Sequence, residues 1–213
     1  MATIQPQRRS LAEIKSKLLN PATTSHFQVN IGTPSRSDGS FNRFLRETGL
    51  NYDQDQLNIL CSDAVLPGSR LATSEITNDF HGVRERHVYR RLYDDSIQLS
   101  FYVDANQYHP IKFFEGWMDY VAGDDNFRGI TRTDDNNYYR RLNYPMNRDN
   151  KIGYKSGALT ITKFEKNLDP KKSITYEYVN AFPKGMTSIP VQYGGADLVK
   201  VNVQFAYDRY RMK

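Results

Sequence analysis

The chain has 213 residues, which is long enough to bury a sizeable core, and we expect one domain with elaborations. A hydrophobic content of 38% and a mean hydropathy of −0.70 are low for a compact enzyme of this length, whereas 13% of the residues are aromatic. Tyr combines a large contact area with a polar tip, so this composition favours a β-rich subunit that buries surface against neighbours. An ordinary Tyr-rich sandwich would have the same composition.

The charge is basic but mixed. Lys and Arg number 29 against 24 Asp and Glu, for a formal net charge of +5. This balance permits contact with nucleic acid or another acidic partner, but the interspersed signs favour an ordinary solvated surface. The single Cys61 excludes an internal disulfide and a Cys-based zinc cluster. No apolar run reaches membrane-spanning length, so we expect no membrane anchor and assembly from a cytoplasm.

Residues 1–25 form an expected N-terminal extension. Ser10 is placed to cap a short helix with Glu13 three positions later, and Pro21 ends that helix. An amphipathic helix this short is marginal in water and needs a surface to dock on. That surface is either its own domain or a neighbouring subunit.

Two strands are predicted early in the chain. Residues 26–31 alternate apolar and polar side chains, which predicts the first strand. A second strand is expected at residues 57–61, and the Leu-Pro-Gly sequence at 66–68 predicts a turn.

The segment between those strands breaks the pattern. Residues 32–56 are rich in Gly, Pro and Ser, which predicts a long loop. Within this loop Phe41, Phe44 and Leu45 have the spacing of one helical turn, and Gly49 closes it.

The middle of the chain switches from period 2 to period 3.6. Residues 74–93 are weakly patterned, with a strand expected around 87–92. Residues 97–103 alternate apolar and polar side chains and predict a half-buried strand. Residues 110–122 then place large apolar side chains at helical spacing, and Pro110 suits the first turn of that helix.

The second half is predicted to be β structure around a long polar excursion at residues 124–156. Strands at 157–165 and 173–181 read as a hairpin, residues 183–195 as a turn region, and residues 199–207 as the last strand. The fold class we expect is therefore mainly β with one short helix (α+β), in an antiparallel β-barrel or sandwich.

No constellation of residues points to catalysis. His81 and His87 match no metal-ligand spacing, and the sequence has no Gly-rich phosphate loop, no G-x-S-x-G elbow and no H-E-x-x-H. Adjacent carboxylates at Asp94-Asp95, Asp124-Asp125 and Asp134-Asp135 fit solvated turns better than the two facing carboxyls of a glycosidase. We expect no catalytic residue, no cofactor and no metal, and hence no enzyme.

Three segments interleave Tyr with Arg, at residues 89–93, 138–144 and 207–211. Aromatic platforms flanked by Arg grip single-stranded nucleic acid, and the same residue types are enriched at protein–protein interfaces. Because the segments are dispersed, we favour interface contacts. The candidate subunit-interface residues are Tyr138, Tyr139, Arg140, Arg141, Tyr144, Tyr207, Arg209 and Tyr210.

The order of motifs resembles a known family. Phe27-Gln28-Val29 precedes a C-x-x-A-x-L-P-G pattern at residues 61–68. A strand, an acidic residue and a helix with an F-x-x-W core at residues 114–117 come next, followed by a hairpin and an aromatic-rich strand at 199–210. Over residues 26–211 this order resembles the tail tube proteins of T4-like contractile-tailed bacteriophages, of the myovirus or cyanophage type.

The resemblance implies a single tail-tube-like β domain at residues 26–213, with loops at 32–56 and 124–156 longer than a minimal tube subunit needs. Subunits of the family form six-fold rings, here homo-hexamers, that stack into the hollow inner tail tube through which phage DNA is ejected. The helix at 110–122 is then expected to cover one open face of the barrel. The residues expected to pack it there are Ile111, Phe114, Trp117 and Met118.

The resemblance also implies a set of partners. They are further copies of the chain, the tail sheath, the baseplate and tail terminator proteins, the tape-measure protein and double-stranded DNA in transit. The location implied is the tail of the virion, assembled in the host cytoplasm. Because a cationic bore would multiply weak phosphate contacts and stall the DNA, we expect lumen-facing positions to be acidic or neutral.

Two alternatives stay open. A baseplate tube-initiator protein of the same fold would stop at one ring instead of polymerising. A cytoplasmic nucleic-acid-binding protein that uses the Tyr/Arg clusters would bind strongly, as a monomer, and in a salt-sensitive way.

Overall fold

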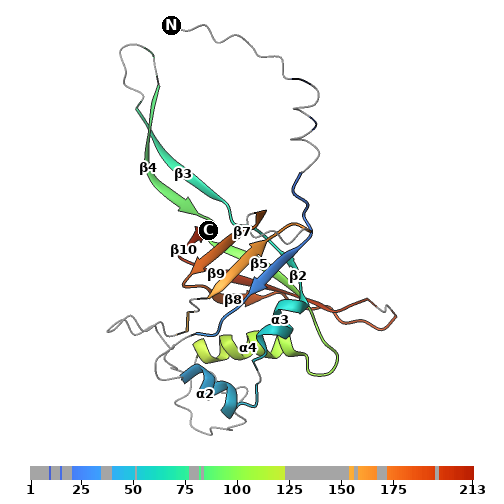
Figure 1. Cartoon of the computed structure of the whole chain (residues 1–213). Coiled ribbons are helices and arrows are strands. Elements are labelled where there is room, and N and C mark those ends of the chain that lie inside the picture. Colours follow the sequence, from blue (N-terminus) through green and yellow to red (C-terminus); the bar gives the residue numbers. More distant parts are fainter. Residues whose placement is uncertain are drawn as a thin grey trace, which may run out of the picture.

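The structure is a computed structural model in which two four-stranded sheets, a projecting two-stranded ribbon and three helices can be traced (Figure 1). The residues it describes are 10, 15, 21–34, 40–50, 52–76, 82, 84–122, 154–155, 158–166, 172–194 and 197–213.

All strand pairs are antiparallel. The first sheet has the order β1-β6-β7-β10, with β1 Phe27–Asn30, β6 Leu159–Lys163, β7 Ile174–Val179 and β10 Arg209–Met212. The second has the order β2-β5-β9-β8, with β2 Cys61–Ala64, β5 Ser96–Tyr102, β9 Lys200–Ala206 and β8 Phe182–Met186. The ribbon consists of β3 Ser69–Ile76 and β4 Glu85–Tyr93.

The second sheet is built on the clearest alternation in the sequence. Ile97, Leu99 and Phe101 of β5 lie opposite Phe205, Val203 and Val201 of β9, and all six side chains are buried. Cross-strand partners share one face of a sheet, so this register places a continuous apolar face against the core.

The first sheet contributes to the same core. Val29 of β1 lies opposite Ile161 of β6, and Leu159 lies opposite Tyr178 of β7; all four are fully buried. These side chains and those of the second sheet belong to one hydrophobic cluster. The β6–β7 pair confirms the predicted hairpin.

Helix α4 (His109–Ala122) covers the core beside β8 and β9 (Figure 1). Phe114 and Trp117 are fully buried, and the Phe114 ring lies 5.1 Å from Phe101 and 5.6 Å from Phe205. The Trp117 indole N–H donates a 2.9 Å hydrogen bond to the Tyr154 carbonyl, which satisfies its polar atom. The flanking residues Ile111 and Met118 are half-buried.

The expectation of a single helix and an open loop at residues 32–56 is wrong. Helix α2 (Ser40–Glu47) contains the predicted helical turn, and its Phe41 ring packs 5.6 Å from Trp117 of α4. Helix α3 spans Gln54–Leu60. These helices are stabilised because their apolar side chains pack against α4 and the core. Local composition does not reveal this packing.

The predicted strand at residues 57–61 is mostly helix. The Asp53 side chain caps α3 by accepting a 3.1 Å hydrogen bond from the Gln56 N–H, and the strand β2 begins only at Cys61. A short apolar run cannot be assigned to strand or helix by periodicity alone.

Two further corrections concern the sheets. The first part of the predicted turn region at residues 183–195 belongs to a strand, β8, and the predicted last strand is followed by a separate strand, β10. Among the described residues, no pairing closes either sheet into a barrel, so the closed-barrel form of the expected fold is not present. Most of the excursion at 124–156 and of the extension at 1–25 lies outside the described residues.

Candidate assembly surfaces

The β3–β4 ribbon extends away from both four-stranded sheets (Figure 1). Nearly all of its side chains are exposed, including the apolar Leu71 at 60%, Val88 at 55% and Tyr89 at 63%. An isolated two-stranded ribbon is marginally stable in water because neither face is buried. Within the chain, the ribbon therefore leaves its apolar side chains exposed to solvent.

The base of the ribbon is held to the first sheet by Arg91. Its guanidinium lies 5.0 Å from the Tyr93 ring and 5.5 Å from the Tyr210 ring, and it donates hydrogen bonds to Ser69 Oγ at 3.0 Å and to the Tyr210 hydroxyl at 3.2 Å. The Tyr93 and Tyr210 rings pack edge to face at 5.3 Å. Two of the three predicted Tyr/Arg clusters thus contact each other within one chain. The Arg91 guanidinium and the Tyr93 and Tyr210 rings pack on one another, so their faces are not free to stack on a nucleic-acid base.

The predicted interface residues have different surroundings. Tyr207 is buried and packs 5.0 Å from Tyr178, and burial, with the nearby Asp94 carboxylate, raises the pKa of its phenol to about 12. Tyr207 is therefore part of the core of the single chain. Arg209 is exposed and Tyr210 half-buried on the edge strand β10. The cluster at residues 138–144 lies outside the described residues.

The described part of the ribbon is cationic. Its five arginines face only two glutamates, and Glu75 lies 3.7 Å from Arg84 and 3.8 Å from Arg86. The arginines on the two strands and at the start of β4 are Arg70, Arg84, Arg86, Arg90 and Arg91. The exposed surface of the described ribbon therefore combines apolar side chains with arginines.

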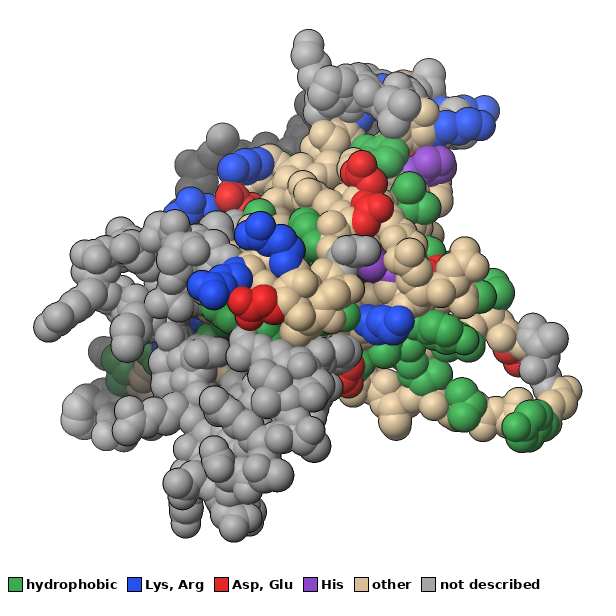
Figure 2. Space-filling view, turned by 90° about the horizontal axis from the view of Figure 1, so that it is seen from below, with side chains coloured by type: hydrophobic (Ala, Val, Ile, Leu, Met, Phe, Trp, Pro, Cys, Tyr) green, Lys and Arg blue, Asp and Glu red, His purple; other side chains and the backbone are tan. Residues whose placement is uncertain are grey.

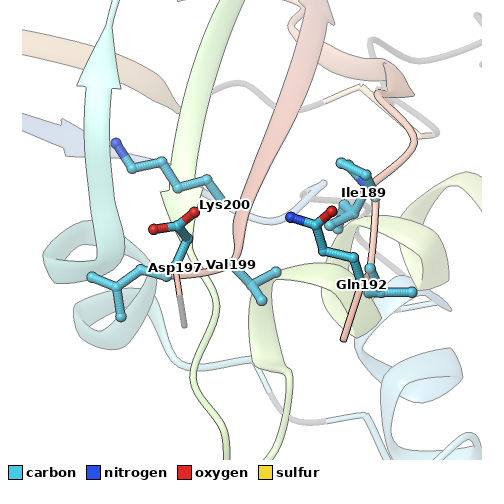
Figure 3. Close-up of a pocket in the computed structure, with 8 residues that line it drawn as sticks. Ile189, Gln192, Asp197, Val199 and Lys200 are labelled. Atoms are coloured by element: carbon cyan, nitrogen blue, oxygen red, sulfur yellow. The ribbon is translucent and has the colours of Figure 1, made fainter. Parts of the chain in front are cut away.

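A pocket of about 420 Å³ lies in the loop between β8 and β9 (Figure 3). Ile189 and Gln192 line one side, and Asp197 and Val199 line the other. The rim is apolar and solvent-exposed, with Val191 at 86% and Leu198 at 76% exposure. The full lining is Ile189, Pro190, Val191, Gln192, Asp197, Leu198, Val199 and Lys200.

The charged residues of the lining are Asp197 and Lys200. Lys200 lies 3.7 Å from Asp63 and 4.8 Å from the Tyr102 ring centroid. The Val103 N–H donates a 3.0 Å hydrogen bond to the carbonyl of Val199, a residue of the pocket lining.

Asp104 is held as an anion. Its carboxylate accepts hydrogen bonds from the Gln107 N–H at 2.8 Å and the His109 N–H at 2.7 Å. Desolvation by burial raises the pKa of this carboxyl, but the backbone donors outweigh it and hold the pKa below its usual value.

The outer face of the second sheet is polar and mostly neutral. Gln98 lies opposite Gln204, and Ser100 lies opposite Asn202, whose Oδ1 accepts a 2.7 Å hydrogen bond from the Ser100 hydroxyl. The outer face of the first sheet, by contrast, carries Arg209 and other charged side chains.

Each four-stranded sheet ends in two edge strands, β1 and β10 in the first and β2 and β8 in the second. Edge strands present backbone N–H and C=O groups that can pair with another chain. Pairing between copies is therefore available to this fold at both sheets.

Metal-ligating side chains do not gather in the described part of the chain. No group of three His, Cys, Asp or Glu side chains there could hold a metal ion. On the face seen in Figure 2, Lys and Arg side chains alternate with Asp and Glu and form no field of a single sign. None of the described helices is long and apolar enough to cross a membrane.

A sequence model described as phage tail tube protein matches residues 22–213. The chain belongs to the phage tail tube protein family. This confirms the resemblance to tail tube proteins and places the chain among structural tail components. No curated protein sequence matches this tail tube protein.

Solved structures share the fold at low identity. The tube terminating cap of the anti-feeding prophage is 14% identical, with 91% of each chain covered and a TM-score of 0.52. A sheath/tube terminator structure of the extracellular contractile injection system PVC is 14% identical, with 91% and 97% covered and a TM-score of 0.51. A chain of the anti-feeding prophage baseplate is 12% identical, with 91% and 96% covered and a TM-score of 0.52.

Sequence reasoning missed the ribbon as a unit. β3 carries no alternation because both of its faces are exposed, so period 2 is absent where it would normally reveal a strand. The signal that could have found it is the turn at residues 66–68 followed by the β-branched and aromatic residues of β4.

Proposed function

We propose that this tail tube protein forms the inner tube of a T4-like contractile tail. Six copies make a ring, rings stack, and the hollow tube conducts double-stranded DNA during ejection. The observation that carries the proposal is family membership over residues 22–213, combined with a fold that leaves two edge strands on each sheet. Closing a ring is the symmetric way to satisfy such edges without uncontrolled association.

The wall of the tube is built by the second sheet in this proposal. Its edge strands β2 and β8 lie at opposite sides of the sheet, so β2 of one copy can pair with β8 of the next around a ring. The outer face that this wall presents carries Gln98, Ser100, Asn202 and Gln204. Neutral side chains bind phosphates weakly, which suits a bore through which DNA must move.

The remaining partners follow from the place of a tube in a contractile tail. The sheath surrounds the tube, the baseplate and tail terminator bound its ends, and the tape-measure protein occupies it before DNA does. The protein then resides in the virion after assembly in the host cytoplasm. The structures that share its fold come from a tube cap, a sheath/tube terminator complex and a baseplate, which supports this setting.

Electron microscopy of the purified protein at high concentration, combined with light scattering, tests the proposal. We expect hollow tubes of stacked rings whose length increases with protein concentration. A persistent monomer that binds single-stranded nucleic acid in a salt-sensitive way would contradict it and support the nucleic-acid-binding alternative.

A second candidate is a ring that starts or ends the tube. The fold neighbours at a terminating cap and a baseplate favour it, since such rings share the fold of the tube itself. The same experiment separates the two candidates. A tube protein gives long polymers, whereas an initiator or terminator stops at a single ring.

A further inference from the structure

Two short connections join the two four-stranded sheets. β7 of the first sheet ends at Val179, and β8 of the second begins at Phe182. β9 of the second sheet ends at Ala206, which pairs with Phe182, and β10 of the first begins at Arg209, which pairs with Val179. The four strands therefore form one continuous antiparallel pair that passes from one sheet into the other. We call the connecting residues the inter-sheet bend; they are Asn180, Ala181, Tyr207 and Asp208.

Side-chain and backbone hydrogen bonds hold this bend. Asn180 has a left-handed φ of 59°, a conformation that Asn adopts more readily than most residues with a side chain. Its amide group donates a 2.5 Å hydrogen bond to one carboxylate oxygen of Asp208, and the Asp208 N–H donates a 3.1 Å hydrogen bond to the Val179 carbonyl. The other carboxylate oxygen lies 3.4 Å from the Lys155 ammonium. Asp208 therefore ties its own strand to the opposite strand and to Lys155.

The inter-sheet bend is also the shortest link between the sheets in the described part of the chain. The connection from β1 to β2 contains α2 and α3, and the connection from β5 to β6 contains α4. Each side of the bend has only two residues, so few backbone dihedrals separate one sheet from the other. The inner side is packed, since Ala181 is fully buried and the buried Tyr207 ring lies 5.0 Å from Tyr178. The conformation of the bend therefore sets the angle between the sheets.

We infer that Asn180 and Asp208 are positioning residues for assembly, whose hydrogen bond fixes the angle between the sheets and thereby the curvature of the ring. This inference rests on the proposed tube function. Edge strands of both sheets can pair with the next copy, so the angle between the sheets decides the rotation from one copy to the next. That rotation is about 60° in a ring of six and about 51° in a ring of seven, so a change of roughly 9° alters the number of copies.

Electron microscopy of assembled rings and tubes tests this role through the ring diameter, which a loss of stability alone does not change. Asn180→Gly permits the left-handed backbone but removes the side-chain hydrogen bond. We expect this variant to lose the single wild-type diameter and to form rings of several diameters.

His26→Gly is the matched control. His26 also has a left-handed φ, of 67°, but it directly precedes β1, at the edge of the first sheet opposite β10. We expect His26→Gly to keep the wild-type diameter. A single wild-type diameter in Asn180→Gly, or the same spread of diameters in both variants, would overturn the inference while leaving the tube function intact.

An exchange of the two side chains provides a second readout. Asn180→Asp alone places two carboxylates against each other and should spread the diameters as Asn180→Gly does. The double variant Asn180→Asp/Asp208→Asn again has one amide donor and one carboxylate acceptor at these positions, so it should return to a single diameter. A double variant with diameters as spread as those of the single variant would contradict the pairing.

The angle between the sheets can also be measured in the unassembled chain. Spin labels at Gln28→Cys and Gln204→Cys, on the outer faces of the two sheets, report it by double electron–electron resonance in a Cys61→Ser background. We expect Asn180→Gly to broaden the distribution of distances between the labels. An unchanged distribution would overturn the inference whether or not rings form. Failure of the wild-type protein to form any ring or tube would instead overturn the proposed function, and with it the role of the bend in a ring.

Discussion

Arg91 of β4 donates a 3.2 Å hydrogen bond to the hydroxyl of Tyr210 in β10, across 119 positions of the sequence. This contact joins the base of the β3–β4 ribbon to the first sheet, although the ribbon leaves the body next to the second sheet. The contact therefore holds the base of the ribbon against the first sheet.

We predict that Tyr210→Phe loosens the base of the ribbon. The ring contacts remain and only the hydroxyl is lost, so the free energy of unfolding should fall by about 0.5–1.5 kcal/mol, toward the lower end because the site is partly exposed. Urea unfolding measures the change, and amide hydrogen exchange should speed up in β4. Tyr193→Phe is the matched control, because Tyr193 is fully exposed and should give no change.

The packing of α4 leads to a second prediction. Phe114 is fully buried between Phe101 and Phe205, so Phe114→Ala should lower the free energy of unfolding by about 3–5 kcal/mol. Ile111→Ala, at a half-buried position of the same helix, should cost clearly less. Equal losses in denaturant titrations of the two variants would show that α4 does not pack as the structure has it.

The pKa of Asp104 gives a third prediction, for pH. The folded pKa of this carboxyl is below its ordinary value, so its ionisation stabilises the fold above the unfolded pKa of about 3.9. That contribution is lost as the pH falls through the folded pKa. Asp104→Asn should therefore be less stable than wild type at neutral pH, with the difference shrinking in acid. A stability difference that stays constant between neutral and strongly acidic solution would contradict this role for Asp104.

The neutral outer face of the second sheet gives a fourth prediction, which rests on the proposed function. Gln204→Arg should leave tube formation intact but make the tubes retain double-stranded DNA at low salt, and it should slow DNA ejection. Gln28→Arg makes the same change on the outer face of the first sheet and is the control. If Gln28→Arg impedes DNA and Gln204→Arg does not, the first sheet lines the bore.

The clearest elements of the fold could be predicted because each has one buried face and one exposed face. β5 and β9 each bury one face, so their alternation is complete, and α4 carries a wide apolar stripe with Pro110 in its first turn. Because neither face of the ribbon is buried, the sequence of β3 shows no alternation of apolar and polar residues.

Other elements depend on long-range contacts, which cannot be predicted from the local sequence pattern. β8 contains Pro183 and Gly185, which argue for a turn; a strand forms because β8 is an edge strand and its register shifts at these residues. Of the candidate interface residues, Tyr207 is buried against Tyr178, a partner 29 positions away.

Local periodicity and the order of short motifs were therefore sufficient to predict the family, the mainly β composition and the strand-to-helix unit at the centre of the chain. Long-range contacts, by contrast, could be read only from the folded chain, in which Arg91 contacts Tyr210 and Tyr207 lies in the core. The physical reason is that strand pairing and burial depend on which surfaces pack together in the folded chain. Many different arrangements are compatible with the same local sequence pattern, so that pattern alone does not select one.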